Sequence, residues 1–169
     1  MLDQIFLDYS ARKLRQNVDR LDKCLARLTE DQIWSREHES ENAVGNLLLH
    51  LAGNVRQWII SGVGEVPDRR DRDSEFNART GPVKAELLAG LRDTVEEACR
   101  VIEPLTSERL NAVVHVQKYD VSVLEAIYHV VEHFGQHTGQ IIFATKLLTG
   151  EELGFYTHLK CASHTEKTP

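Results

Sequence analysis

Apolar residues recur at three- and four-residue steps in four separate stretches of the chain, a spacing that places them on one face of a helix. Polar and charged residues fill the other positions, as expected of helices with one buried and one solvated face. The pattern predicts amphipathic helices over residues 2–28, 43–61, 82–102 and 123–149. No convincing sheet pattern accompanies them. We therefore predict an all-α four-helix bundle.

The connection between the second and third predicted helices is unusually long. It covers residues 62–81 and contains glycines, a proline and the charge run that begins at Asp68. A connection of this length can carry the chain back along the bundle, so that the two helices run parallel. Alternation over residues 113–118 predicts one short extended piece. We expect a single domain over residues 1–156, followed by a tail over residues 157–169.

Charge and apolar content exclude two classes of protein. Asp and Glu number 26 against 20 Lys and Arg, which gives a formal net charge of −6. A nucleic-acid-binding domain normally has a basic face, so no nucleic-acid partner is expected. No apolar run approaches the roughly 18 residues that a membrane span needs, so no membrane partner is expected either. The N-terminus lacks the pattern of a signal peptide, and three unpatterned cysteines suit a reducing compartment, which together indicate a cytoplasmic protein.

The segment from Tyr128 to Gln140 holds three of the eight histidines, at four-residue spacing. Residues four apart lie one turn above each other on a helix. At about 100° per residue, His137 lies roughly 60° from the centre of the apolar stripe, His133 roughly 100° and His129 roughly 140°. His133 and His137 therefore border the core, whereas His129 is expected to point to solvent. Two imidazoles so placed can bind one metal ion.

A third candidate ligand comes from the second helix. His50 flanks the apolar stripe of that helix, with Asn54 one turn further on. Three imidazoles from two facing helices would hold one side of an ion and leave the other side for water or substrate. A pair of histidines four apart also occurs by chance, and a single histidine beside a stripe is often only a hydrogen-bonded core residue. Spacing alone leaves both interpretations open.

One protease motif competes with this interpretation. His129, Glu132 and His133 fit the H-x-x-E-H pattern of inverted zinc proteases, in which Glu132 would be the general base. That motif belongs to much larger enzymes with an acidic ligand well downstream, and too little chain follows His133 here. We therefore discount a protease.

Two segments resemble a known family. The sequence from His133 to Gln140, HFGQHTGQ, resembles the H-x-x-x-H-x-G-Q signature of the DinB-like (damage-inducible) family. The sequence from Asn46 to Asn54, NLLLHLAGN, looks like the second helix of that family. The resemblance extends from Asp31 to about Tyr156. The charged loop at Asp68–Phe76 resembles the loop of an uncharacterised branch of this family.

The resemblance implies a fold, a ligand set and a class of activity. The fold would be a bundle of up-down-down-up topology, which agrees with the long connection. The family's metal ligands correspond to His50, His133 and His137, and the ion would be divalent, most often zinc or nickel. Characterised relatives include transferases that use low-molecular-weight thiols, and homodimers are common.

We therefore favour a divalent-metal-dependent enzyme of the thiol-dependent transferase or hydrolase type, acting on a thiol or another small molecule. The alternative is a non-catalytic, metal-stabilised dimer that serves binding or structure. Metal-bound histidines usually donate their second ring nitrogen to a partner, and Asn54, Glu132 and Gln140 are the candidates for orienting ligands or substrate. Arg72 and Glu75 could close over the site from the long loop, although a solvated charge run is the favoured interpretation.

Overall fold

The computed structural model describes residues 2–161, 163, 165 and 168. Its elements are, in chain order, α1 (Leu2–Leu25), α2 (Glu30–Trp34), α3 (Val44–Val55), the π-helix η1 (Arg56–Val63), α4 (Arg72–Asn77), α5 (Lys84–Ile102), α6 (Ser107–Asn111), β1 (Val113–Val116), β2 (Tyr119–Ser122), α7 (Val123–Thr149) and the 3₁₀-helix η2 (Thr157–Lys160). The prediction of an all-α bundle is confirmed. The division into a domain over 1–156 and a tail over 157–169 stays a prediction.

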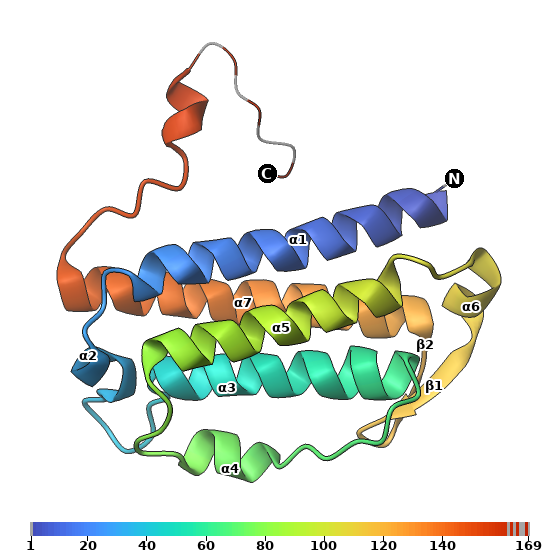
Figure 1. Ribbon diagram of the computed structural model, residues 1–169, viewed down its shortest axis with the longest axis horizontal. Coiled ribbons are helices and arrows are strands. Elements are labelled where there is room, and N and C mark those ends of the chain that lie inside the picture. Colours follow the sequence, from blue (N-terminus) through green and yellow to red (C-terminus); the bar gives the residue numbers. More distant parts are fainter. Residues whose placement is uncertain (1, 162, 164, 166–167, 169) are drawn as a thin grey trace.

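Four long helical segments form the bundle: α1, α3 with its continuation η1, α5 and α7 (Figure 1). In Figure 1, α1 and α7 run in one direction, whereas α3 and α5 run in the other. This is the up-down-down-up order. The parallel pair α3 and α5 requires the chain to return along the whole bundle, and the long connection that contains α4 does so below the bundle in this view.

The four stripes meet in one continuous core. Leu14, Leu21, Leu51, Ile102 and Phe134 are among the side chains with no more than about one hundredth of their surface exposed. Local sequence signals also fix where the helices begin and end. Ser122 and Glu125 form a capping box at the start of α7, and Gly150 ends it in a left-handed conformation at φ 69°.

The structure corrects the predicted second helix. It runs past Ser61 to Val63, and from Arg56 onward it winds as a π-helix. The wider turn shows in the hydrogen bond from the Gly64 N–H to the Ile59 carbonyl oxygen, five residues back, at 2.8 Å. The short helices α2, α4 and α6 lie in segments that the pattern left irregular. The predicted extended piece is strand β1, which pairs with β2 in an antiparallel hairpin.

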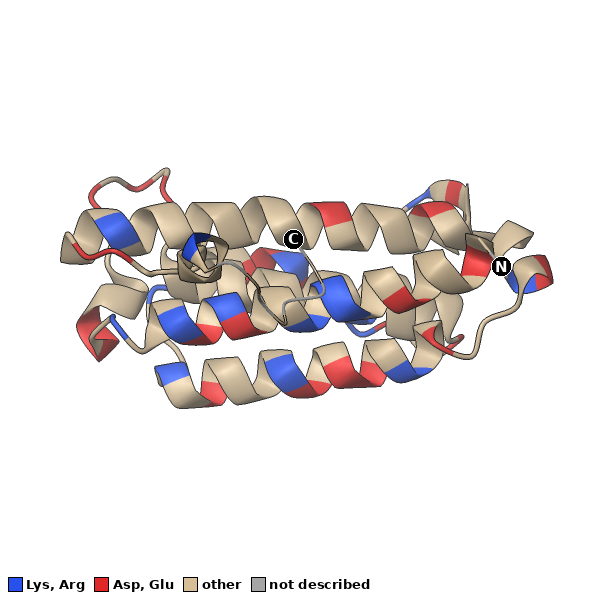
Figure 2. Ribbon diagram, turned by 90° about the horizontal axis from the view of Figure 1, so that it is seen from above, with Lys and Arg blue, Asp and Glu red and all other residues tan. Residues whose placement is uncertain are grey.

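Charges of both signs cover the helices. On the face seen in Figure 2, Lys and Arg alternate with Asp and Glu along the exposed turns instead of gathering in one patch. Several of them form ion pairs between helices at the surface, such as Arg15 of α1 with Glu96 of α5 and with Glu103, which directly follows α5. Among the described helices, none has the length and apolar character needed to cross a membrane.

Candidate metal centre

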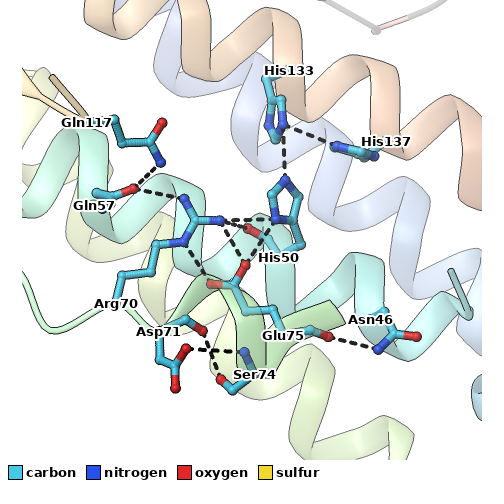
Figure 3. A network of polar contacts seen from close by, with 10 residues as sticks. All are labelled: Asn46, His50, Gln57, Arg70, Asp71, Ser74, Glu75, Gln117, His133 and His137. Carbon is cyan, nitrogen blue, oxygen red and sulfur yellow. Dashed lines mark hydrogen bonds and ion pairs between the residues drawn. The ribbon is translucent and has the colours of Figure 1, made fainter. Parts of the chain in front are cut away.

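Three imidazoles from α3 and α7 converge between the two helices (Figure 3). The Nε2 atom of His133 lies 3.2 Å from Nε2 of His50 and 3.1 Å from Nε2 of His137. His50 is buried, and the other two are half-buried. Within the described ranges 2–161, 163, 165 and 168, the metal-capable group at this place consists of these three nitrogens. The structure thus brings together all three histidines predicted as ligands.

The period of α7 explains the placement of its two histidines. Phe134 and Thr138 follow His133 and His137 directly and are buried, so the histidines stand at the edge of the core. His129 continues the same row, but the expectation that it points to solvent is wrong. Its ring is half-buried at 4.4 Å from the ring of Trp58, which η1 supplies. The angle around α7 could not foresee a side chain from another helix.

A buried ion pair from the long loop contacts His50 on the side of the ring that faces away from the other two histidines. The Nδ1 atom of His50 lies 3.0 Å from Oε2 of Glu75, and the carboxylate of Glu75 accepts two bonds from Arg70, at 2.7 and 2.8 Å. The side chains of Arg70 and Glu75 are 3% and 9% exposed. The favoured interpretation of this charge run as solvated is therefore wrong for these two residues. It holds for Arg72, which is exposed and lies over the ring of Phe76.

A glycine makes room for this ion pair. A Cβ atom built on Gly53 of α3 would lie 2.0 Å from Oε1 of Glu75 and 2.9 Å from Nε of Arg70. Only a residue without a side chain allows the pair to lie against this turn of α3. The loop segment itself is fixed by Asn46, whose side-chain amide donates to the carbonyl oxygens of Glu75 and Ala78.

The β1–β2 hairpin adds one more residue to the hydrogen-bond network around Arg70 and Glu75. Arg70 also donates to Oε1 of Gln57 on η1 at 2.9 Å, and the amide of Gln117 donates to the same oxygen (Figure 3). Gln117 and Lys118 form the tight turn of the hairpin, with φ of 51° and 69°. This left-handed conformation is costly for residues with a side chain, and here it accompanies the contact of Gln117 with the network.

The two histidines of α7 have weaker hydrogen-bond support at Nδ1 than His50 has. The Nδ1 atom of His137 lies 2.7 Å from Oε1 of Gln140, one turn further along the same helix. The Nδ1 atom of His133 is buried and has no hydrogen-bond partner in the described structure. His50 therefore has a charged, buried partner, His137 has a neutral and exposed one, and His133 has none.

The surroundings keep the α7 imidazoles neutral. Burial, together with the proximity of His137 and His50, lowers the pKa of His133 from 6.5 to about 3. Burial also lowers the pKa of His137, although its bond to Gln140 acts in the opposite direction. For Glu75, burial raises the pKa, but the bonds from Arg70 and His50 more than offset it and leave its pKa below the ordinary value. The site thus combines two neutral imidazoles on α7 with an ionised carboxylate next to His50.

The donor set fits a cation. In the neutral form of His50, the Nδ1 proton belongs to the bond with Glu75, because the carboxylate can only accept, and Nε2 then keeps a lone pair for a metal ion. The protons of the Arg70 Nη2 atom, 3.0 Å from the same Nδ1, go to Glu75 and to the carbonyl oxygen of His50. Nδ1 of His137 likewise donates to Gln140. The lone pairs on Nε2 of His50 and on Nε2 of His137 then both face Nε2 of His133. That atom carries one proton at most, so it can donate to only one of them. A metal ion at this point would satisfy all three nitrogens.

The three residues predicted to orient ligands or substrate, Asn54, Glu132 and Gln140, differ in their contacts. Gln140 contacts His137, one of the three candidate ligands. Glu132 is exposed and accepts a bond from Gln136, so the structure places it neither on a ligand nor in the role of a protease base. Asn54 is buried, and its side-chain oxygen has no hydrogen-bond partner in the described structure. The residues that sequence reasoning missed are Arg70 and Gln57. Gly53 within the helix pattern was the available signal, because a glycine there indicates a close approach.

Comparisons with known proteins agree with this geometry. A family model described as "Protein of unknown function (DUF1572)" matches residues 2–160. The chain belongs to this family. Members of the family are DinB-like, so the resemblance stated from the sequence is confirmed. No curated protein matches the chain.

Two solved structures show the same fold as this DUF1572 chain. One is a conserved protein from Enterococcus faecalis, at TM-score 0.69 and 16% identity over 84% of this chain and 96% of that one. The other is the DinB-like protein YjoA from Bacillus subtilis, at TM-score 0.65 and 15% identity over 89% of this chain and 96% of that one. At these identities the likeness concerns the fold.

Proposed function

We propose that this protein is a divalent-metal-dependent enzyme, of the thiol-dependent transferase or hydrolase type, that holds its ion through His50, His133 and His137. The supporting observation is the convergence of three Nε2 atoms without a fourth protein ligand in the described part of the chain. Three protein ligands and an open position are typical of catalytic zinc sites, whereas structural sites have four. Zinc or nickel suits an all-imidazole set.

When bound, a divalent ion would supply Lewis acidity, which lowers the pKa of a coordinating water to about 7 and deprotonates a coordinating thiol. The chain's own residues provide orientation. Glu75 fixes the tautomer and the ring plane of His50, and Gln140 does the same for His137. Both α7 ligands are half-buried, and the proposal requires that a small thiol or a water molecule reach the open side past them.

The first experiment measures the metal content of untagged protein by elemental mass spectrometry. We expect about one zinc or nickel ion per chain, lost in His50→Ala, His133→Ala and His137→Ala. His129→Ala is the matched control, because His129 is half-buried on the same helix but lies outside the three-nitrogen group. Wild-type protein that stays metal-free after reloading with either ion would refute the site.

A second experiment tests catalysis separately. Metal-loaded protein is screened with small thiols paired with electrophiles, and with hydrolysable esters and amides. An activity that His137→Ala abolishes and His129→Ala retains would support an enzyme. A loaded protein that binds its ion but shows no such activity would leave the non-catalytic, metal-stabilised module as the better interpretation. Homodimer formation stays a prediction, to be checked by light scattering.

A further inference from the structure

A groove lies between α3 and α7, next to the three histidines but not lined by them. It has a volume of about 580 Å³ and is also lined by the segment that leads from α2 into α3. Its walls include Val44, Leu47, Gln140, Phe143, Ala144 and Leu147. Ligand pockets for small molecules commonly measure about 300–1,000 Å³. The groove is therefore large enough for part of a substrate.

The order of residues on the two helices connects this groove to the metal centre. On α7, His137, Gln140 and Ala144 follow each other at three- and four-residue steps and so share one helix face. On α3, Leu47 lies one turn before His50 on the same face. Gln140 belongs to both places, because it lines the groove and accepts the bond from His137. The groove thus begins one turn along α7 from His137, at the residue that contacts its Nδ1 atom.

The walls are chemically suited to an uncharged, apolar occupant. Phe143 and Leu147 are 65% and 70% exposed, a high value for large apolar side chains that stand next to each other. Two of the three charged residues that line the groove have protein partners, whereas the third, Glu37, is exposed and its carboxylate lies at the rim. Arg36 donates to Asn46 and to the carbonyl oxygen of Ala78, and Glu41 accepts the backbone N–H groups of residues 37 and 38.

We propose that the groove binds an apolar segment of the substrate whose head group lies among His50, His133 and His137. The substrate class is then an amphipathic small molecule: a group with a lone pair for the ion, joined to an uncharged hydrocarbon or aromatic part. This inference rests on the proposed metal site and adds the class of molecule that the site accepts. An extended aliphatic part of about 5–10 Å spans the one to two helical turns that the groove covers.

The test uses straight-chain hydroxamates, from acetohydroxamate to octanohydroxamate, binding to zinc-loaded protein in calorimetric titrations. Their head group is constant and binds zinc, so the change in affinity along the series reports the groove alone. We expect affinity to rise about three- to fourfold for each added methylene until the groove is full. The rise should be lost in Ala144→Phe, which fills the groove, while acetohydroxamate binds with unchanged affinity.

Two further variants separate packing from folding. Leu147→Asn changes an exposed side chain, so it should leave the fold intact and weaken octanohydroxamate several-fold without affecting acetohydroxamate. Ala89→Phe on exposed α5 surface is the matched control for the added ring and should leave the whole series unchanged.

The possible failures can be told apart. If acetohydroxamate binds but affinity is flat along the series, the groove is not a substrate site and the metal site stands. If no hydroxamate binds to protein that carries its ion, the open coordination position itself is refuted. If Ala144→Phe converts a dimer into a monomer in sedimentation, the groove is an interface between two copies and the proposal is overturned.

Discussion

The two sides of the histidine cluster are built differently. On the α3 side, His50 is backed by a buried ion pair, Glu75 with Arg70, that reaches it from a loop. On the α7 side, His137 has only the exposed amide of Gln140, and His133 has no partner for Nδ1. The comparison teaches that a single helix can present two ligands by its own period, whereas the third ligand needs tertiary structure to fix it.

The largest effect is expected from breaking the ion pair. Glu75→Gln keeps the shape of the side chain but leaves the buried guanidinium of Arg70 without a counter-charge, which should lower the free energy of unfolding by about 3–5 kcal/mol. Urea denaturation of metal-free protein measures it. Glu39→Gln removes the partner of Arg79 in an exposed pair and should cost no more than about 1 kcal/mol. Equal losses in both variants would show that burial does not distinguish the two pairs.

A smaller loss is expected when the space for the pair is filled. In Gly53→Ala the new methyl group would collide with Glu75 and Arg70, so we expect a loss of about 1–3 kcal/mol although alanine favours helix. Gly90→Ala on α5 is the control, because a Cβ there meets nothing within 4 Å. That variant should gain about 0.5–1 kcal/mol. A gain in both variants would contradict the close approach at Gly53.

On the α7 side, we expect the buried imidazole of His133 to make the stability of metal-free protein depend on pH. The folded pKa of His133, about 3, lies below its ordinary 6.5, so between these values the unfolded chain binds more protons. Stability is therefore complete above about pH 6.5 and falls as the pH is lowered, by at most about 1.4 kcal/mol per unit for one group. Urea midpoints between pH 7.5 and 4.5 measure this slope. His133→Gln should reduce it, and parallel curves would exclude His133 as its source.

The smallest effect is expected at Gln140. Because its contact with His137 is neutral and exposed, Gln140→Ala should weaken zinc binding by about tenfold, the low end for partners of ligand histidines. Glu75→Gln should weaken it more, towards a hundredfold. Competition titration against a chromophoric chelator measures both. The reverse order would mean that the α7 partner controls the geometry of the site.

The same contrast separates what the sequence could predict from what it could not. The helices and the pair His133 and His137 follow from periodicity, which is a local property. His50 was a candidate because it flanks the apolar stripe of its helix, but only the motif resemblance favoured it over a hydrogen-bonded core histidine. Nothing local distinguishes Arg70 from Arg72 in a run of alternating charges; only the path of the loop over α3 buries the first and exposes the second. His129 shows the same limit, because Trp58 covers it from η1.

The sequence distances within the cluster carry a consequence for folding. His133 and His137 are four residues apart, whereas His50 and His133 are separated by 83 positions. A helix such as α7 can form within about a microsecond, but a contact over so long a loop must first meet the entropy of closing it. We therefore expect the two-histidine half of the centre to form before the complete centre does. A divalent ion that the three histidines bind would then meet the α7 pair first during refolding and acquire His50 when α3 docks.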